Sequence, residues 1–209
     1  HFPEKLIKVR NNGFNVPLRS GLDDSWLYRE GVIYAGRLSI AKGSKVLQHL
    51  IENLKCQINI VGNGPALIPL KKFCVDHEFL HVNFFGRLDN KSTIALLEKA
   101  VVCVVPSQCG DSYPTTALES LSVGTPIVAS NLGGLSDIVA MSSGGQLVDH
   151  NDKDAYVKGV IGFLGDKQKA QEVGNNGLKY VAESLTPERK GRELMEVYNQ
   201  TLTDYRLRR

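Results

Sequence analysis

The sequence predicts an α/β fold in which a parallel sheet carries helices on both faces. From residue 32 onward, short apolar runs alternate with longer segments of helical periodicity. Turn residues, above all glycine, follow the ends of several apolar runs. Because a strand, a helix and a second strand form a right-handed crossover, consecutive strands are expected to pair in parallel and to be buried on both faces.

The expected elements follow one another with little unassigned sequence between them. Each apolar run is short and rich in β-branched or aromatic residues, which favour strands, and each helical segment repeats apolar residues at the helical period. The expected strands are Val32–Ala35, Gln57–Val61, His81–Phe85, Val101–Val105, Ile127–Ala129 and Gly145–Val148. The expected helices are Gly43–Leu54, Pro65–His77, Lys91–Lys99, Thr115–Val123 and Ser136–Ala140, followed by Asp152–Leu164, Lys167–Ser184 and Pro187–Tyr205 at the end of the chain.

Residues 1–30 differ from the rest of the chain and are expected to form a segment near an interdomain hinge, with one domain over residues 31–209. Lys5–Val9 is consistent with a short strand, and a turn is expected at Asn11-Asn12-Gly13. Asn15–Glu30 is polar and interrupted by proline and glycine, which indicates a surface connection with Trp26 and Leu27 packed beneath it. Because the chain begins with His1, it is expected to be a fragment of a longer protein.

Composition restricts the class of protein. The chain has 209 residues, of which 42% are hydrophobic and 22% charged, typical of a globular domain with one core. The net charge of +3 favours neither nucleic-acid binding nor a strongly basic membrane surface. Four cysteines without metal-ligand spacing suit a reducing, cytoplasmic compartment, and five scattered histidines indicate no metal site. The sequence also lacks an apolar run long enough for a membrane span.

The stretch from Val104 to Asp137 contains the strongest candidate site. A polar loop there leads from an apolar strand into a helical segment, and ligands collect at such junctions because free backbone N–H groups favour negative charge. Asp111 lies in the loop and Glu119 in the helix. Carboxylates repel bare phosphate, so their natural partners are hydroxyl groups. Taken alone, an Asp in a loop and a Glu in a helix are more often solvated surface residues.

Two further loops follow apolar strands. Gly36-Arg37-Leu38, with Lys42 close behind, can offer a guanidinium fork and an ammonium to a diphosphate, although such cations are often plain surface charge. Gly62 begins a tight strand-to-helix turn. The geometry of such a turn accounts for these residues without a role in ligand binding. Arg87 ends another strand, where it could stack on a base or remain solvated.

The spacing of these blocks resembles the C-terminal, donor-binding domain of retaining GT-B glycosyltransferases of family 4, the glycosyl transferases group 1. The pattern D-S-Y-P-x4-E-S-L-x-x-G-T-P-I-V-A-S-x-x-G-G is similar to that family's acidic E-x7-E block, and G-R-L-x-x-x-K-G is similar to its pyrophosphate-binding block. The resemblance covers about Lys5 to Tyr205. It implies a Rossmann-like parallel sheet of about six strands, one half of a GT-B fold, extended by C-terminal helices.

The resemblance also implies roles for individual residues. Arg37 and Lys42 would neutralise the departing nucleoside diphosphate, Asp111 would bind donor-sugar hydroxyls, and Glu119 would bind the ribose. These four are the expected catalytic residues. The expected donor-binding residues are Gly36, Gly62, Arg87, Leu88, Ser112, Tyr113, Pro114, Thr115 and Thr116.

Three positions depart from the family pattern. Asp111 is one methylene shorter than the usual Glu, and Asp137 likewise replaces Glu after Gly133-Gly134. Pro114 stands where many members have Gly, which removes one N–H donor from the loop.

The implied function is transfer of a hexosyl group from a nucleotide-diphosphate sugar, such as a UDP- or GDP-hexose, to an acceptor in glycan or polysaccharide synthesis. The implied reaction retains the anomeric configuration and needs neither cofactor nor metal. The expected partners are the nucleotide sugar and an N-terminal acceptor-binding domain absent from this chain, with no nucleic acid. A lipid-linked acceptor would add peripheral contact with the inner face of the membrane.

Two alternatives remain open from the sequence. A GT-B sugar-nucleotide epimerase shares the sheet and the pyrophosphate cradle, and the combined D-x7-E and G-R-L-x-x-x-K-G pattern argues against it. A stand-alone nucleotide-sugar-binding module would be favoured if the native gene encoded only this segment.

Overall fold

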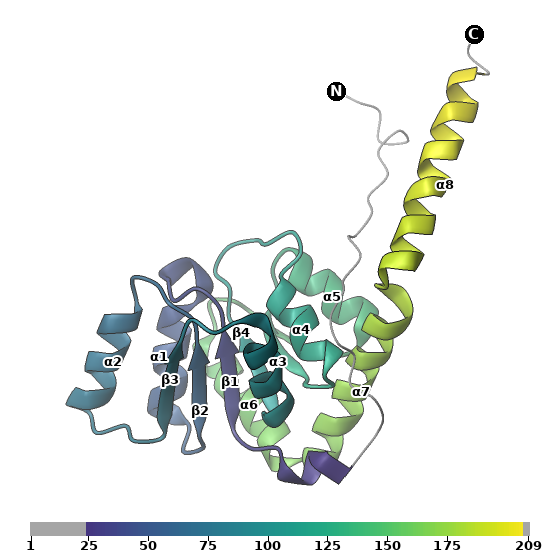
Figure 1. Cartoon of the computed structure of the whole chain (residues 1–209). Helices are drawn as coiled ribbons and strands as arrows, with labels where there is room; N and C mark the ends of the chain where they lie inside the picture. The colour runs from purple at the N-terminus through teal and green to yellow at the C-terminus, as the bar shows by residue number, and fades with distance from the viewer. Residues whose placement is uncertain (1–23, 207–209) are drawn as a thin grey trace.

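Six parallel strands form one sheet in the order β3-β2-β1-β4-β5-β6. Figure 1 labels four of these neighbours, β3, β2, β1 and β4. The computed structural model describes residues 24–206. Every neighbouring pair of strands is parallel, so the expected α/β class and strand number are confirmed. The strands are β1 (Val32–Ala35), β2 (Ile58–Val61), β3 (Val82–Gly86), β4 (Val102–Val105), β5 (Ile127–Ser130) and β6 (Gly145–Val148).

The central strands are buried on both faces because successive side chains point into two different cores. In β1, Val32 and Tyr34 belong to one hydrophobic cluster, and Ile33 and Ala35 to the other. All four residues of β1, β4 and β5 are buried. The sheet edges β3 and β6 retain partly exposed positions. This arrangement explains why the sequence shows continuous apolar runs rather than strict alternation.

Helices cover both faces of the sheet. Residues of α1 (Ser44–Asn53), α2 (Leu67–Asp76) and α6 (Lys153–Gly165) build the first cluster. The second cluster contains residues of α3 (Asn90–Lys99), α4 (Thr115–Ser122) and α5 (Gly134–Ser142), together with Val181 of α7 (Lys167–Ser184). The result is a three-layer arrangement of helices, sheet and helices.

The last helix, α8 (Pro187–Arg206), projects away from the sheet and its covering helices (Figure 1). Its large apolar side chains Leu194, Met195, Tyr198 and Leu202 are about half exposed. Among the helices between residues 24 and 206, none combines the length and apolar character that crossing a membrane requires.

The segment before β1 is anchored in the core. A short 3-10 helix, η2 (Asp24–Tyr28), places Trp26 in the core, where the Arg29 guanidinium carbon lies 4.2 Å from the centroid of its ring. The expectation that Leu27 also packs inward is wrong, because its side chain is 70% exposed. Adjacent residues of a tight helix point in different directions, and the larger indole occupies the buried position. The expected strand Lys5–Val9 and turn Asn11–Gly13 lie outside the described residues.

Candidate functional site

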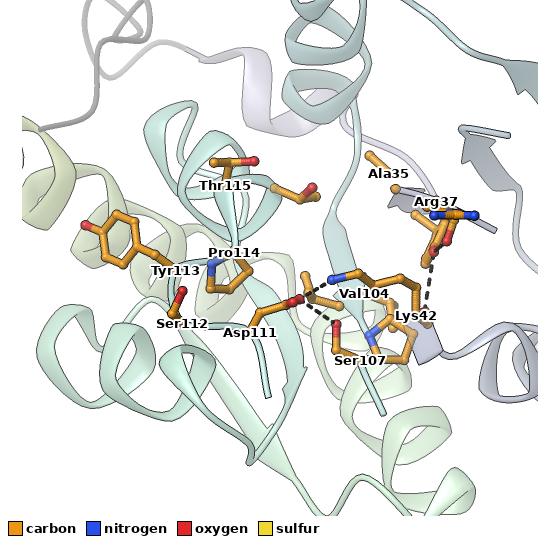
Figure 2. A pocket seen from close by; sticks show the side chains of 15 residues that line it. Ala35, Arg37, Lys42, Val104, Ser107, Asp111, Ser112, Tyr113, Pro114 and Thr115 are labelled. Carbon is orange, nitrogen blue, oxygen red and sulfur yellow. Dashed lines mark hydrogen bonds and ion pairs between the residues drawn. The ribbon is translucent and has the colours of Figure 1, made fainter. Parts of the chain in front are cut away.

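A cavity of about 320 Å³ lies at the carboxyl ends of β1 and β4 (Figure 2). These strands are neighbours in space but not in sequence, and the winding of the sheet reverses between them. Parallel sheets collect ligands at such a reversal because the two following loops diverge and leave a crevice. Nine of the predicted site residues line the cavity: Gly36, Arg37, Lys42, Asp111, Ser112, Tyr113, Pro114, Thr115 and Thr116.

The loop after β1 is held by a buried tyrosine that the sequence did not single out. Tyr34 Oη donates a hydrogen bond to the carbonyl oxygen of Arg37 at 2.8 Å, and it lies 3.4 Å from that of Lys42. Burial, together with nearby Cys103, raises the pKa of the phenol, which remains a neutral donor. Tyr34 therefore fixes both ends of the segment that carries the two candidate cations.

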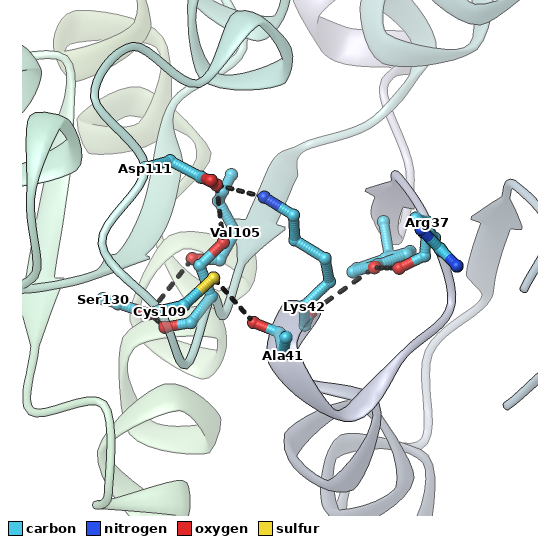
Figure 3. A network of polar contacts seen from close by, with 9 residues as sticks. Arg37, Ala41, Lys42, Val105, Cys109, Asp111 and Ser130 are labelled. Carbon is cyan, nitrogen blue, oxygen red and sulfur yellow. Dashed lines mark hydrogen bonds and ion pairs between the residues drawn. The ribbon is translucent and has the colours of Figure 1, made fainter. Parts of the chain in front are cut away.

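The clearest feature of the cavity is an ion pair between Lys42 and Asp111, which both line it (Figures 2 and 3). Their side chains are 34% and 28% exposed. Ser107 Oγ lies 3.5 Å from Asp111 Oδ2 as a further donor. A buried chain continues behind Ser107, because Ser130 Oγ donates to the Ser107 carbonyl at 2.6 Å and lies 2.7 Å from Tyr156 Oη. The Asp111 carboxylate therefore has the Lys42 ammonium and the Ser107 hydroxyl as hydrogen-bond donors.

The loop that carries Asp111 rests on the start of α5. The backbone N–H of Gly134 donates to the Asp111 carbonyl at 2.7 Å. A Cβ atom added at Gly134 would lie 2.2 Å from the Ser112 carbonyl oxygen, closer than any side chain permits. The second glycine of the Gly133-Gly134 pair therefore allows the close backbone contact that positions the acid.

The loop after Asp111 leads into α4, whose first turn lines the cavity. Pro114 precedes the first helical residue and has no N–H, so the backbone donors there belong to Thr115 and Thr116. The ring of Tyr113 points away from the Lys42–Asp111 pair (Figure 2) and packs against the second hydrophobic cluster. Burial raises the pKa of Tyr113 to about 12, with a smaller contribution from Tyr180. Its side chain therefore supports the loop from behind.

Glu119 lies one turn deeper in α4 and is not among the residues that line the cavity. Its Oε1 accepts a hydrogen bond of 2.9 Å from Asn90 Nδ2 at the start of α3. Burial raises the pKa of the Glu119 carboxyl, and the hydrogen bond from Asn90 partly opposes that rise. The predicted role of Glu119 stays a prediction.

A second cavity, of about 460 Å³, adjoins the first on the β2 and β3 side. Gly36 and Arg37 line both cavities, and Gly62 and Arg87 line the second. A Cβ atom at Gly62 would lie 1.8 Å from the Gly36 carbonyl oxygen, so this glycine is required for two loops to pack. Leu88 lines neither cavity and instead packs against the second hydrophobic cluster.

The combined features suit a ligand with both phosphates and hydroxyl groups. Two cations and the first turn of α4 offer donors for phosphate oxygens, and the Asp111 carboxylate offers acceptors for hydroxyls. Within residues 24–206, no three His, Cys, Asp or Glu side chains are grouped to hold a metal ion.

The sequence of the chain matches the family described as glycosyl transferases group 1 over residues 29–180. It is 28% identical to an uncharacterized glycosyltransferase of Methanocaldococcus jannaschii over 94% of this chain and 54% of that protein. It is 30% identical to the glycogen synthase of Mycobacterium tuberculosis over 67% of this chain and 35% of that protein. The chain spans about half the length of the curated relatives it matches first, 48% and 54%.

Solved structures share the fold. The sucrose-phosphate synthase of Thermosynechococcus elongatus superposes with a TM-score of 0.73 and 26% identity, over 83% of this chain and 45% of that one. The HepE protein of Anabaena, solved in complex with UDP and glucose, gives a TM-score of 0.74 at 16% identity, over 84% of this chain and 49% of that one.

Proposed function

Because the chain belongs to the glycosyl transferases group 1 family, we propose that it is the donor-binding half of a retaining GT-B glycosyltransferase of family 4. Its donor is a nucleotide-diphosphate sugar such as a UDP- or GDP-hexose, and its product belongs to glycan or polysaccharide synthesis. An N-terminal domain of the same protein binds the acceptor, in the cytoplasm or at the inner face of the membrane.

The single observation that carries the proposal is the meeting of Lys42 and Asp111 in one cavity at the reversal of the sheet. These residues come from loops after two central strands, β1 and β4, and present opposite charges to the same space. A diphosphate matches the ammonium, and a sugar hydroxyl matches the carboxylate. The HepE structure with UDP and glucose supports this ligand class for the fold.

Binding of the donor exchanges the partners of this ion pair. Lys42 turns to the diphosphate, whose negative charge increases as the sugar departs, and Arg37 adds a second cation at the junction of the two cavities. Asp111 loses its contact with the Lys42 ammonium and accepts hydrogen bonds from the hexose hydroxyl groups instead. Stabilisation of the departing diphosphate by placed cations is the main source of rate acceleration, because charge that develops in the transition state meets groups already in position.

Titration calorimetry of the 209-residue chain with UDP, GDP, UDP-glucose and GDP-mannose tests the proposal. We expect one nucleoside diphosphate to bind, and transfer to be negligible in this chain, because the acceptor domain that would close the cleft and exclude water is absent. No binding of any of the four would contradict the proposal.

The full reading frame distinguishes the alternatives. Transfer of the hexose to an acceptor with the α- or β-configuration of the donor preserved, read by proton NMR, supports the retaining transferase. Conversion of the nucleotide sugar into an epimeric nucleotide sugar, with no acceptor product and no net release of nucleoside diphosphate, supports the epimerase. A gene that encodes only this segment, with binding and no turnover, supports the binding module.

Tyr34→Phe is expected to weaken nucleoside-diphosphate binding about three- to tenfold, because the segment from Arg37 to Lys42 loses the donor that fixes its ends. The midpoint of urea unfolding should shift little, since one neutral hydrogen bond contributes only about 1 kcal/mol. Tyr28→Phe is the matched control, because Tyr28 is 81% exposed. Equal affinities of the Tyr34→Phe variant and the unaltered chain would show that the loop is held by other contacts.

A further inference from the structure

A hydrogen bond links the start of α3 to the second turn of α4. Asn90 Nδ2 donates to Glu119 Oε1 at 2.9 Å, between residues 29 positions apart. Asn90 is the first residue of α3, and the preceding Asp89 caps that helix by accepting from Ser92 N at 2.7 Å. The backbone of Asn90 is therefore fixed, and its short side chain can reach few places.

The contact leaves the carboxylate of Glu119 in a defined orientation. A glutamate has three side-chain torsions, so a half-buried Glu without a partner would sample several rotamers. The bond from Asn90 occupies Oε1, and the second oxygen, Oε2, keeps its lone pairs for another donor. The bond also opposes the effect of burial on the Glu119 pKa and so favours the ionised, accepting form.

We propose that Asn90 is a positioning residue that aims Glu119 at the ribose of the bound nucleotide, and so sets the preference for ribonucleoside over deoxyribonucleoside diphosphates. This inference rests on the proposed function, since it takes the ligand to be a nucleoside diphosphate, and on the ribose contact that the family resemblance implies for Glu119. Asn90 lies outside the D-x7-E pattern that includes Glu119, so that pattern does not predict this role. If the contact served only to pack α3 against α4, its removal would leave the ratio of ribonucleotide to deoxyribonucleotide affinity unchanged.

The test measures a ratio of affinities. The 209-residue chain is titrated with UDP and its 2′-deoxy and 3′-deoxy forms, and with the three corresponding guanosine diphosphates. A charge-assisted hydrogen bond to one hydroxyl corresponds to roughly a tenfold to hundredfold preference for the ribonucleotide. We expect Asn90→Ala to reduce that preference to about threefold or less, and Glu119→Gln to reduce it at least as far.

The double variant Asn90→Ala/Glu119→Gln should match Glu119→Gln alone, because Asn90 acts only through Glu119. Asn176→Leu, on exposed surface of α7, serves as the control and should keep the full preference.

Two results would overturn the inference. One is Asn90→Ala binding all the nucleotides more weakly by the same factor, or with no change, so that the ratio stays as in the unaltered chain. The other is an unchanged ratio in Glu119→Gln, which would show that Glu119 does not contact the ribose. If the unaltered chain binds none of the six nucleotides, the proposed function fails and this inference fails with it.

Discussion

Arg29→Met is expected to lower the free energy of unfolding by about 3–5 kcal/mol, the largest change in stability that we predict. Arg29 is 1% exposed. It donates to the Val123 carbonyl at 2.7 Å, to Thr125 Oγ1, and at 3.4 Å to the Ala100 carbonyl. Methionine fills a similar volume but has no hydrogen-bond donor. The buried acceptors at the ends of α3 and α4 therefore lose the hydrogen bonds that Arg29 donates.

Urea unfolding followed by circular dichroism measures this change. Arg29→Lys should recover only part of the loss, because an ammonium cannot reproduce the planar fork of the guanidinium. Arg192→Met is the matched control and should change stability by less than about 0.5 kcal/mol, since Arg192 is exposed on α8. A loss below about 1 kcal/mol in Arg29→Met would show that water or neighbouring groups replace the bonds.

Lys42→Ala is expected to weaken nucleoside-diphosphate binding by roughly tenfold to hundredfold, the largest change in affinity that we predict. Two effects act in the same direction. The diphosphate loses an ammonium donor, and Asp111 keeps a negative charge in the cavity without the cation that pairs with it here. Binding of an anion beside an unpaired carboxylate is disfavoured by like-charge repulsion.

The companion substitution separates these two effects. Asp111→Asn alone should leave nucleoside-diphosphate affinity unchanged or improve it, because Lys42 no longer has to leave an ion pair. In the double variant Lys42→Ala/Asp111→Asn, affinity should partly recover relative to Lys42→Ala. Calorimetry of the four proteins gives the coupling between the residues. Lys45→Ala, at an exposed position in α1, is the control; a loss equal to that of Lys42→Ala would assign the effect to general positive charge.

The strands could be predicted closely because strands that are buried on both faces appear in the sequence as continuous apolar runs. Val32–Ala35 and Gly145–Val148 have the predicted bounds, since apolar runs between turn residues leave little freedom. The predicted start of α5 was two residues late. Gly134 is the first helical residue, and its N–H donates to the Asp111 carbonyl in the loop before α4.

The loops of the site were also predictable, because they follow strand ends in a parallel sheet. What the sequence could not show is how distant side chains support them. The sequence places Tyr34 in the predicted strand Val32–Ala35, but no periodicity predicts that its hydroxyl donates to a loop carbonyl. Asn90 and Arg29 likewise act across 29 and 94 positions of the chain. Such contacts depend on the register of packed helices, which a single sequence does not specify.

The pairing of β1 with β4 also determines when the site comes into being during folding. Val32 lies opposite Val102, and Lys42 reaches Asp111 across 69 positions of the chain. Closing such a long loop is entropically costly and slow compared with forming a local helix. A ligand that bridges the two loops recognises a contact that exists only after the centre of the sheet has closed. Its binding therefore retards the opening of the folded chain far more than it hastens its formation.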